Sequence, residues 1–138
     1  MDILTTVRVV AVVSAGLVAG IYVGDRAGTC YTRRGLSAAA FVQFQQILHV
    51  HFVRFMPPLV LTGLLTAAAW LLMIRSQWTS TEFWLTGAPT LGVALIAVIT
   101  RVVNVPLNDQ LMTWNVAAPP TDLRERCAPW DLLTSDPG

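Results

Sequence analysis

The sequence contains no lysine, and charged residues of any kind are scarce. All nine basic residues are arginine, eight acidic residues nearly balance them, and charged residues make up 12% of the 138-residue chain. Soluble domains carry roughly 25% charged residues. The net charge of +1 supplies no field that would attract a polyanion, and no segment alternates basic with aromatic residues. We therefore exclude nucleic-acid binding.

Cysteine and the common catalytic motifs are also scarce or missing. Cys30 and Cys127 are too few for a zinc site by themselves; they are either separate thiols or, in an oxidising compartment, one disulfide. The chain has no Gly-rich phosphate loop and no HExxH, CxxC or GxSxG motif. An enzymatic site would therefore consist of a few side chains around an apolar pocket.

Long apolar runs dominate what remains, since 54% of the residues are hydrophobic. Three runs, 3–24, 55–74 and 83–105, are long enough as helices to cross a hydrocarbon core of about 30 Å. Pro57 and Pro58 are expected in the first turn of the second span, where a missing N–H matters least. Gly16 and Gly20 form a GxxxG spacing that would allow close helix packing.

Segment 36–53 also lacks charge but contains three glutamines and two histidines. Phe41, Phe44 and Leu48 follow helical spacing on one apolar face. The segment is therefore predicted to be an amphipathic helix that leads into the second span, either at the interface or as an extension of that span. Together the elements predict an all-α, integral membrane helical bundle, with one membrane domain and a polar tail over 116–138.

Arginine placement predicts the orientation of this bundle. With three spans, the loop after the first span and the tail share one side, and the opposite side has only Arg8 and Arg75. The positive-inside rule makes the arginine-rich side cytoplasmic. A disulfide between the cysteines on that side would argue for the reverse. The arginines of the loop and tail are Arg26, Arg33, Arg34, Arg54, Arg124 and Arg126.

The most informative stretch is RVVNVPLNDQLMTWN, residues 101–115. If it is helical, polar groups recur every three to four residues on one face. Because polar groups near hydrocarbon must be paired or line a cavity, this stripe predicts an internal polar pocket. The alternative is a helix end that reaches water, where an asparagine satisfies the carbonyl freed by Pro106. The stripe consists of Arg101, Asn104, Asn108, Leu111 and Asn115.

The histidines lie in the Gln-rich segment. Two residues apart on a helix, His49 and His51 point away from each other, so we predict no metal there and retain the pair only as a weak alternative. His49 shares a face with Gln45 and Gln46 and is the better candidate for proton transfer. Arg54 precedes the proline pair and could bind an anion at the membrane edge.

These residues resemble the anthrone oxygenase-like family of small membrane proteins (DUF1772). The resemblance rests on SAGLVAGIYVG, on QFQQILHVHFVRFMPPL and, most specifically, on TRVVNVPLNDQLMTW. Relatives have a fourth span after the region matching RERCAPWD, so the resemblance implies a four-helix bundle. It also implies oxidation of an anthrone or polyketide-like aromatic compound by molecular oxygen without a further cofactor.

For such a reaction, residue type and position lead to hypotheses about the roles of the polar residues. His49 would be the base, and Arg101, Asn104 and Asn108 would donate to the enolate oxygen. Trp114 could stack on the substrate, with Gln45, Gln46, Arg54 and Asn115 as further binding residues. The partners would be membrane lipid and an apolar aromatic molecule. The alternative is a non-enzymatic membrane subunit, in which the polar residues contact another copy or a partner subunit.

Overall fold

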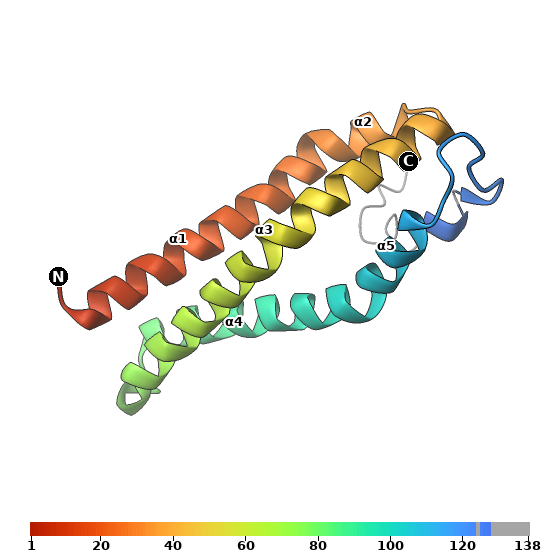
Figure 1. The fold of residues 1–138 in the computed structure, drawn as a ribbon. Helices are drawn as coiled ribbons and strands as arrows, with labels where there is room; N and C mark the ends of the chain where they lie inside the picture. The colour runs from red at the N-terminus through yellow and green to blue at the C-terminus, as the bar shows by residue number, and fades with distance from the viewer. Residues whose placement is uncertain (124, 128–138) are drawn as a thin grey trace. The chain divides into compact units, whose positions relative to one another are not determined.

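The computed structural model describes residues 1–123 and 125–127; Arg124 and residues 128–138, part of the predicted tail, lie outside it. The described residues form helices and no strand (Figure 1). The all-α prediction is therefore confirmed. In chain order the elements are α1 (Ile3–Gly24), the π-helical turn η1 (Asp25–Thr29), α2 (Cys30–Arg34), α3 (Ala38–Met73), the 3-10 turn η2 (Arg75–Gln77), α4 (Thr81–Ile99), the π-helical turn η3 (Thr100–Asn104) and α5 (Val105–Met112).

Three continuous helical stretches are long and apolar enough to cross a membrane: Ile3–Arg34, Ala38–Met73 and Thr81–Met112. Their large apolar side chains are widely exposed, as Leu65 and Leu91 illustrate at 61% and 62%. Monomeric soluble proteins rarely expose such contiguous apolar surface, whereas a bilayer would cover it. The chain is thus a membrane protein whose helices present apolar side chains to lipid.

Helix α3 joins two segments that the sequence analysis separated. The predicted amphipathic helix and the second predicted span form one continuous helix. Pro57 and Pro58 lie inside this helix and not in a first turn. Each proline lacks the N–H that would bond the carbonyl four residues earlier, at Val53 and Arg54. Helices in membranes tolerate such prolines because neighbouring groups satisfy the freed carbonyls.

The third long helix changes its winding just before Pro106. At η3 the backbone N–H of Val105 donates to the carbonyl of Thr100, five residues earlier. Such a π-bulge inserts one residue into the helical repeat and is frequent at functional sites. It also rotates the residues before it relative to those after it. Side chains on the two sides of the bulge therefore do not share the helical face that a constant repeat of 3.6 residues per turn predicts for residues 101–115.

The contacts divide the chain into two compact units. The first unit consists of Met1–Gly20 and Arg54–Val98, and the second consists of Ile21–Val53 and the described residues from Ile99 onward. The boundary in α3 falls between Val53 and Arg54. The carbonyls of these two residues are the ones that receive no hydrogen bond from the prolines four residues later. The boundary in the third long helix falls at Ile99, directly before η3. Two of the three changes of unit thus coincide with interruptions of the regular hydrogen-bond ladder, whereas the third, between Gly20 and Ile21, lies within α1.

In the first unit α1 packs on α3 through Ser14, which is buried, and Gly63. A Cβ added at Gly63 would lie 3.3 Å from the Cβ of Ser14, so the absence of a side chain allows this approach. Gly16 and Gly20 have open space around them. No described helix of this chain packs on these two glycines, because they lie on the opposite side of α1 from its buried residues Ala11, Ser14 and Val18.

Candidate functional site

Gln46 joins α3 to the end of α5 in the second unit. Its Nε2 donates to the backbone carbonyls of Leu111 at 3.0 Å and Trp114 at 2.9 Å. Both carbonyls lie at the end of α5, where a helix runs out of amides of its own. The Leu111 carbonyl also accepts from the backbone N–H of Trp114 at 3.2 Å, so Gln46 is a second donor to Leu111. Gln46 therefore acts as a side-chain cap for another helix, and this use occupies the amide group that the sequence analysis assigned to substrate binding.

Two other amide side chains in the same unit hold buried oxygens without a hydrogen-bond donor among the described residues. They are Oε1 of Gln45, one residue before the cap, and Oδ1 of Asn104, the last residue of η3. A buried acceptor left unpaired costs about 1–3 kcal/mol. Such groups in a folded protein require an explanation, and a ligand that supplies a donor is one.

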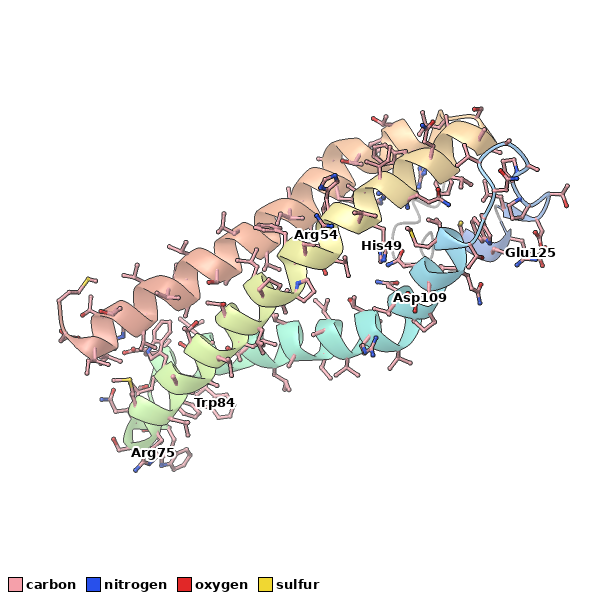
Figure 2. The ribbon with its side chains drawn as sticks, viewed as in Figure 1. His49, Arg54, Arg75, Trp84, Asp109 and Glu125 are labelled. Atoms are coloured by element: carbon pink, nitrogen blue, oxygen red, sulfur yellow. The ribbon has the colours of Figure 1, made fainter. Side chains whose placement is uncertain are left out.

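His49 and Asn108 are two further half-buried polar residues of this unit. His49 lies one turn after Gln45 on α3, and Figure 2 shows it on that helix together with Arg54. Asn108 follows Asn104 by four residues beyond the bulge. The second unit thus contains two pairs of polar residues at helical spacing, one on α3 and one on the η3–α5 segment.

The structure does not place all residues of the predicted polar stripe on one helical face. Arg101 is exposed, Leu111 is fully buried, and Asn115 lies beyond the end of α5. The Oδ1 of Asn115 accepts a hydrogen bond from the backbone N–H of Ala117 at 2.9 Å, which closes the turn after the helix. The prediction is wrong at both ends because the bulge shifts the helical repeat and because α5 stops at Met112.

Three further predicted residues lie elsewhere. Arg54 is exposed and belongs to the first unit, and His51 is exposed. Trp114 packs against the apolar cluster of Val42, Leu123 and Cys127, so its ring is already used within the second unit. Over residues 1–123 and 125–127 no group of three or more His, Cys, Asp or Glu side chains is placed to hold a metal ion.

The two cysteines are both buried in the second unit, and the structure does not join them by a disulfide. The thiol of Cys30 contacts Arg26, whose Nη1 lies 3.7 Å from the sulfur. Near it, Arg33 pairs with Asp25 through two parallel hydrogen bonds of 2.8 and 2.9 Å. The bidentate pair ties the end of the first long helix to η1.

A three-helix polar cluster in the first unit was missed by the sequence analysis. Arg8 of α1 forms an ion pair with Oε1 of Glu82, at the start of α4. Trp70 of α3 donates from Nε1 to the same oxygen at 2.9 Å, and the guanidinium of Arg8 lies 5.6 Å from the Trp70 ring centroid. One signal was available: Arg8 and Glu82 are charges of opposite sign within apolar helices, where charges are usually paired.

A cavity of about 520 Å³ adjoins this cluster, and residues of the first unit alone line it. Its walls come from α1, α3 and α4 and are mainly apolar. The few polar side chains are Ser14, Thr86, Thr90, Trp70 and Glu82. Small-molecule sites typically have this size and this sparse set of polar groups. None of the residues singled out from the sequence as a catalytic or binding group lines this cavity.

A comparison with known protein families identifies the chain. The family model described as anthrone oxygenase matches residues 44–134, more than half of the sequence. The match includes the second half of α3, α4, η3 and α5. No curated protein and no solved structure matched the chain. With its membrane-length helices and a match that spans both the glutamine-rich segment and the asparagine motif, the chain belongs to the anthrone oxygenase family.

Proposed function

We propose that this protein is a membrane oxygenase that converts an anthrone, or a related flat aromatic compound, into the quinone with molecular oxygen. The observation that carries the proposal is the family match over residues 44–134, which contains the proposed base His49 and the proposed donors Asn104 and Asn108. Membrane-length helices suit this substrate class, because such compounds are apolar and partition into the bilayer.

The reaction needs a base and a polarised oxygen. Removal of one proton from the methylene carbon of an anthrone gives an anion delocalised onto the carbonyl oxygen. Its electron pair reduces O₂ as a carbon–oxygen bond forms, giving a peroxide. Loss of the second proton from that carbon breaks the O–O bond, so that one oxygen atom remains as the new carbonyl and the other leaves as water. No external reductant is consumed.

His49 is the group that we assign to proton removal, since an imidazole can be neutral at physiological pH. Asn104 and Asn108 carry amide N–H groups that can stabilise the enolate oxygen. The unpaired oxygens of Gln45 and Asn104 support this assignment, because a phenolic hydroxyl of the substrate would supply the donor that they lack. Arg101, Gln46 and Trp114 are left out, since one is exposed and the others are used in packing.

Oxygen uptake by the purified protein with an anthrone tests the proposal. Anthrones oxidise slowly without an enzyme, so the rate is compared with protein-free micelles. His49→Gln is expected to lower the rate by about 10²–10⁴-fold, the usual contribution of a general base. His51→Gln, an exposed histidine on the same helix, is the matched control and should keep the wild-type rate. Wild-type rates in both His49→Gln and Asn108→Ala would refute the assignment.

We also propose the orientation that the arginines favour, with the loop after the first span and the described part of the tail on the cytoplasmic side. Single cysteines introduced at Ser37 and Ser76, with Cys30 and Cys127 replaced by serine, test it. In intact cells a membrane-impermeant maleimide should label Ser76→Cys at once and Ser37→Cys only after permeabilisation. The reverse pattern would invert the orientation.

A second candidate function, a membrane subunit, is favoured by one observation. Gly16 and Gly20 are exposed with no atom near their missing side chains, and two such glycines allow another helix to approach closely. We propose this face as a contact for a second copy or a partner subunit. Gly16→Leu should reduce cross-linking between copies without unfolding the chain; unchanged cross-linking would exclude this face.

A further inference from the structure

The cavity of the first unit contains hydrogen-bonding groups that the rest of the protein does not use. Ser14 and Thr86 are buried, at 5% and 8% exposure, and both line the cavity. In the part of the chain that the structure describes, neither hydroxyl takes part in a hydrogen bond. Thr90 differs, because its hydroxyl donates to the carbonyl of Thr86 at 2.6 Å. Two hydroxyls are therefore available to a molecule inside the cavity.

Glu82 supplies a third group. Arg8 and Trp70 both donate to Oε1 of its carboxylate, and no residue among those described donates to Oε2. An ionised carboxylate only accepts hydrogen bonds, so Oε2 can be satisfied only by a donor. The pairing with Arg8 keeps the charge at Glu82 compensated. Glu82 lines the cavity with its side chain 37% exposed, so Oε2 can accept from a donor on a bound molecule.

We propose that this cavity binds a neutral, apolar, polycyclic aromatic molecule that carries a phenolic hydroxyl, with the hydroxyl donating to Oε2 of Glu82. The apolar walls exclude a strongly charged ligand, because a charge inside them would be desolvated without a partner. The size suits a small molecule. The choice of a polycyclic phenol rests on the proposed function, since hydroxylated anthrones and their quinones belong to that class.

A lipid acyl chain fits the groups of the cavity less well. It would fill the apolar volume but would leave the buried hydroxyls of Ser14 and Thr86 without partners. An unpaired polar group in a site of this kind strongly disfavours the ligand that fails to satisfy it. A phenol satisfies the carboxylate as a donor, and its oxygen can at the same time accept from one of the two hydroxyls.

Binding of 2-hydroxyanthracene to the purified full-length protein, followed by ligand fluorescence, tests the proposal without turnover. The matched ligand is 2-methoxyanthracene, which has the same rings but no donor. We expect the phenol to bind at least about ten-fold tighter than the ether, since a site built for a hydroxyl rejects analogues that lack it. Equal affinities of the two ligands for the wild-type protein would overturn the proposal.

Variants locate the binding. Ala67 lines the cavity and Ala68 is its exposed neighbour on α3, so Ala67→Leu fills the cavity and Ala68→Leu is the matched control. Ala67→Leu should weaken the binding of the phenol by about ten-fold or more, the effect of roughly 1.4 kcal/mol, whereas Ala68→Leu should leave it unchanged. Thr86→Val removes one hydroxyl with little change of shape and should weaken the phenol selectively.

The outcomes separate this site from the proposed reaction. If the wild type binds the phenol and Ala67→Leu does not, but the wild type consumes no oxygen, the binding site is supported and the oxygenase is refuted. If the wild type consumes oxygen, but the phenol binds with equal affinity to the wild type, to folded Ala67→Leu and to Thr86→Val, the binding site is refuted and the oxygenase is not. A phospholipid that copurifies with the wild type and not with Ala67→Leu, without phenol binding, would also overturn the proposal.

Discussion

The side chain of Gln46 donates to the backbone carbonyl of Trp114 at 2.9 Å and so connects the N-terminal part of α3 to the chain that leaves α5. The same Nε2 also serves the carbonyl of Leu111, a residue with no exposed surface. One amide therefore satisfies two carbonyls at a helix end that lies in a mainly apolar environment. The contact places the glutamine-rich segment against the asparagine motif within the second unit.

Loss of this contact should destabilise the second unit. We expect Gln46→Leu to lower the free energy of unfolding by about 1–3 kcal/mol, because the carbonyl of Trp114 loses the amide donor of Gln46. The carbonyl of Leu111 keeps the backbone N–H of Trp114. Thermal unfolding in detergent, followed by circular dichroism, measures the effect. Gln43→Leu is the control, since Gln43 is exposed on the same helix. Equal unfolding temperatures of the two variants would contradict the role given to Gln46.

Gly63 and Gly16 should respond differently to a large side chain. Gly63→Leu forces atoms into the contact with Ser14 and should destabilise the first unit by about 1–3 kcal/mol, as overpacking usually does. Gly16→Leu meets open space and should leave the unfolding temperature of the monomer nearly unchanged. The same thermal measurement compares them, and a greater loss at Gly16 would contradict the packing of α1 on α3.

The effects of substitutions at Arg8 and Glu82 on stability should be coupled. Arg8→Gln and Glu82→Gln are each expected to lower the unfolding temperature, because each leaves the partner charge uncompensated at the edge of an apolar environment. The double variant Arg8→Gln, Glu82→Gln should lose less than the sum of the two single effects. A strictly additive double-mutant cycle would show that the two charges do not interact.

Asp122 should titrate below its ordinary range. The hydrogen bond that Arg126 donates from Nε at 2.8 Å lowers the pKa of Asp122 below 3.8. A lowered pKa in the folded state means that the pair stabilises the fold above pH 3.8, and that this contribution is lost as the pH falls through the lower, folded value. NMR titration of the carboxyl carbon checks this. Arg126→Gln should raise the pKa of Asp122 toward 3.8, whereas Arg75→Gln, a change in the other unit, should not change it.

Much of the architecture followed from hydrophobic runs. Twenty uncharged residues between Arg54 and Arg75 can hardly be anything but a membrane helix, because backbone groups in hydrocarbon must bond within their own segment. The boundaries were less predictable. Pro57 and Pro58 resemble a helix start in sequence, yet α3 continues through them, because the apolar residues on both sides allow the helix to continue in spite of two missing amides.

The positions and partners of the polar side chains were harder to predict from the sequence. A constant helical repeat cannot anticipate the π-bulge at Thr100–Asn104. Arg101, within the bulge, is exposed, whereas Asn104 and Asn108 are half-buried. Glutamines of one segment look alike in sequence: Gln46 caps a distant helix end, while the neighbouring Gln45 keeps an unpaired oxygen. Only contacts between segments far apart in the chain distinguish the two.

Composition and run length were thus sufficient for a helical membrane protein, and one specific motif was sufficient for its family, since both depend on local sequence. The cluster of Arg8, Trp70 and Glu82 and the cavity beside it required the fold, because they join three helices whose residues are separated by as many as 74 positions. Local patterns determine which segments are helical. Packing between helices determines which polar groups are consumed by the structure and which remain available to a ligand.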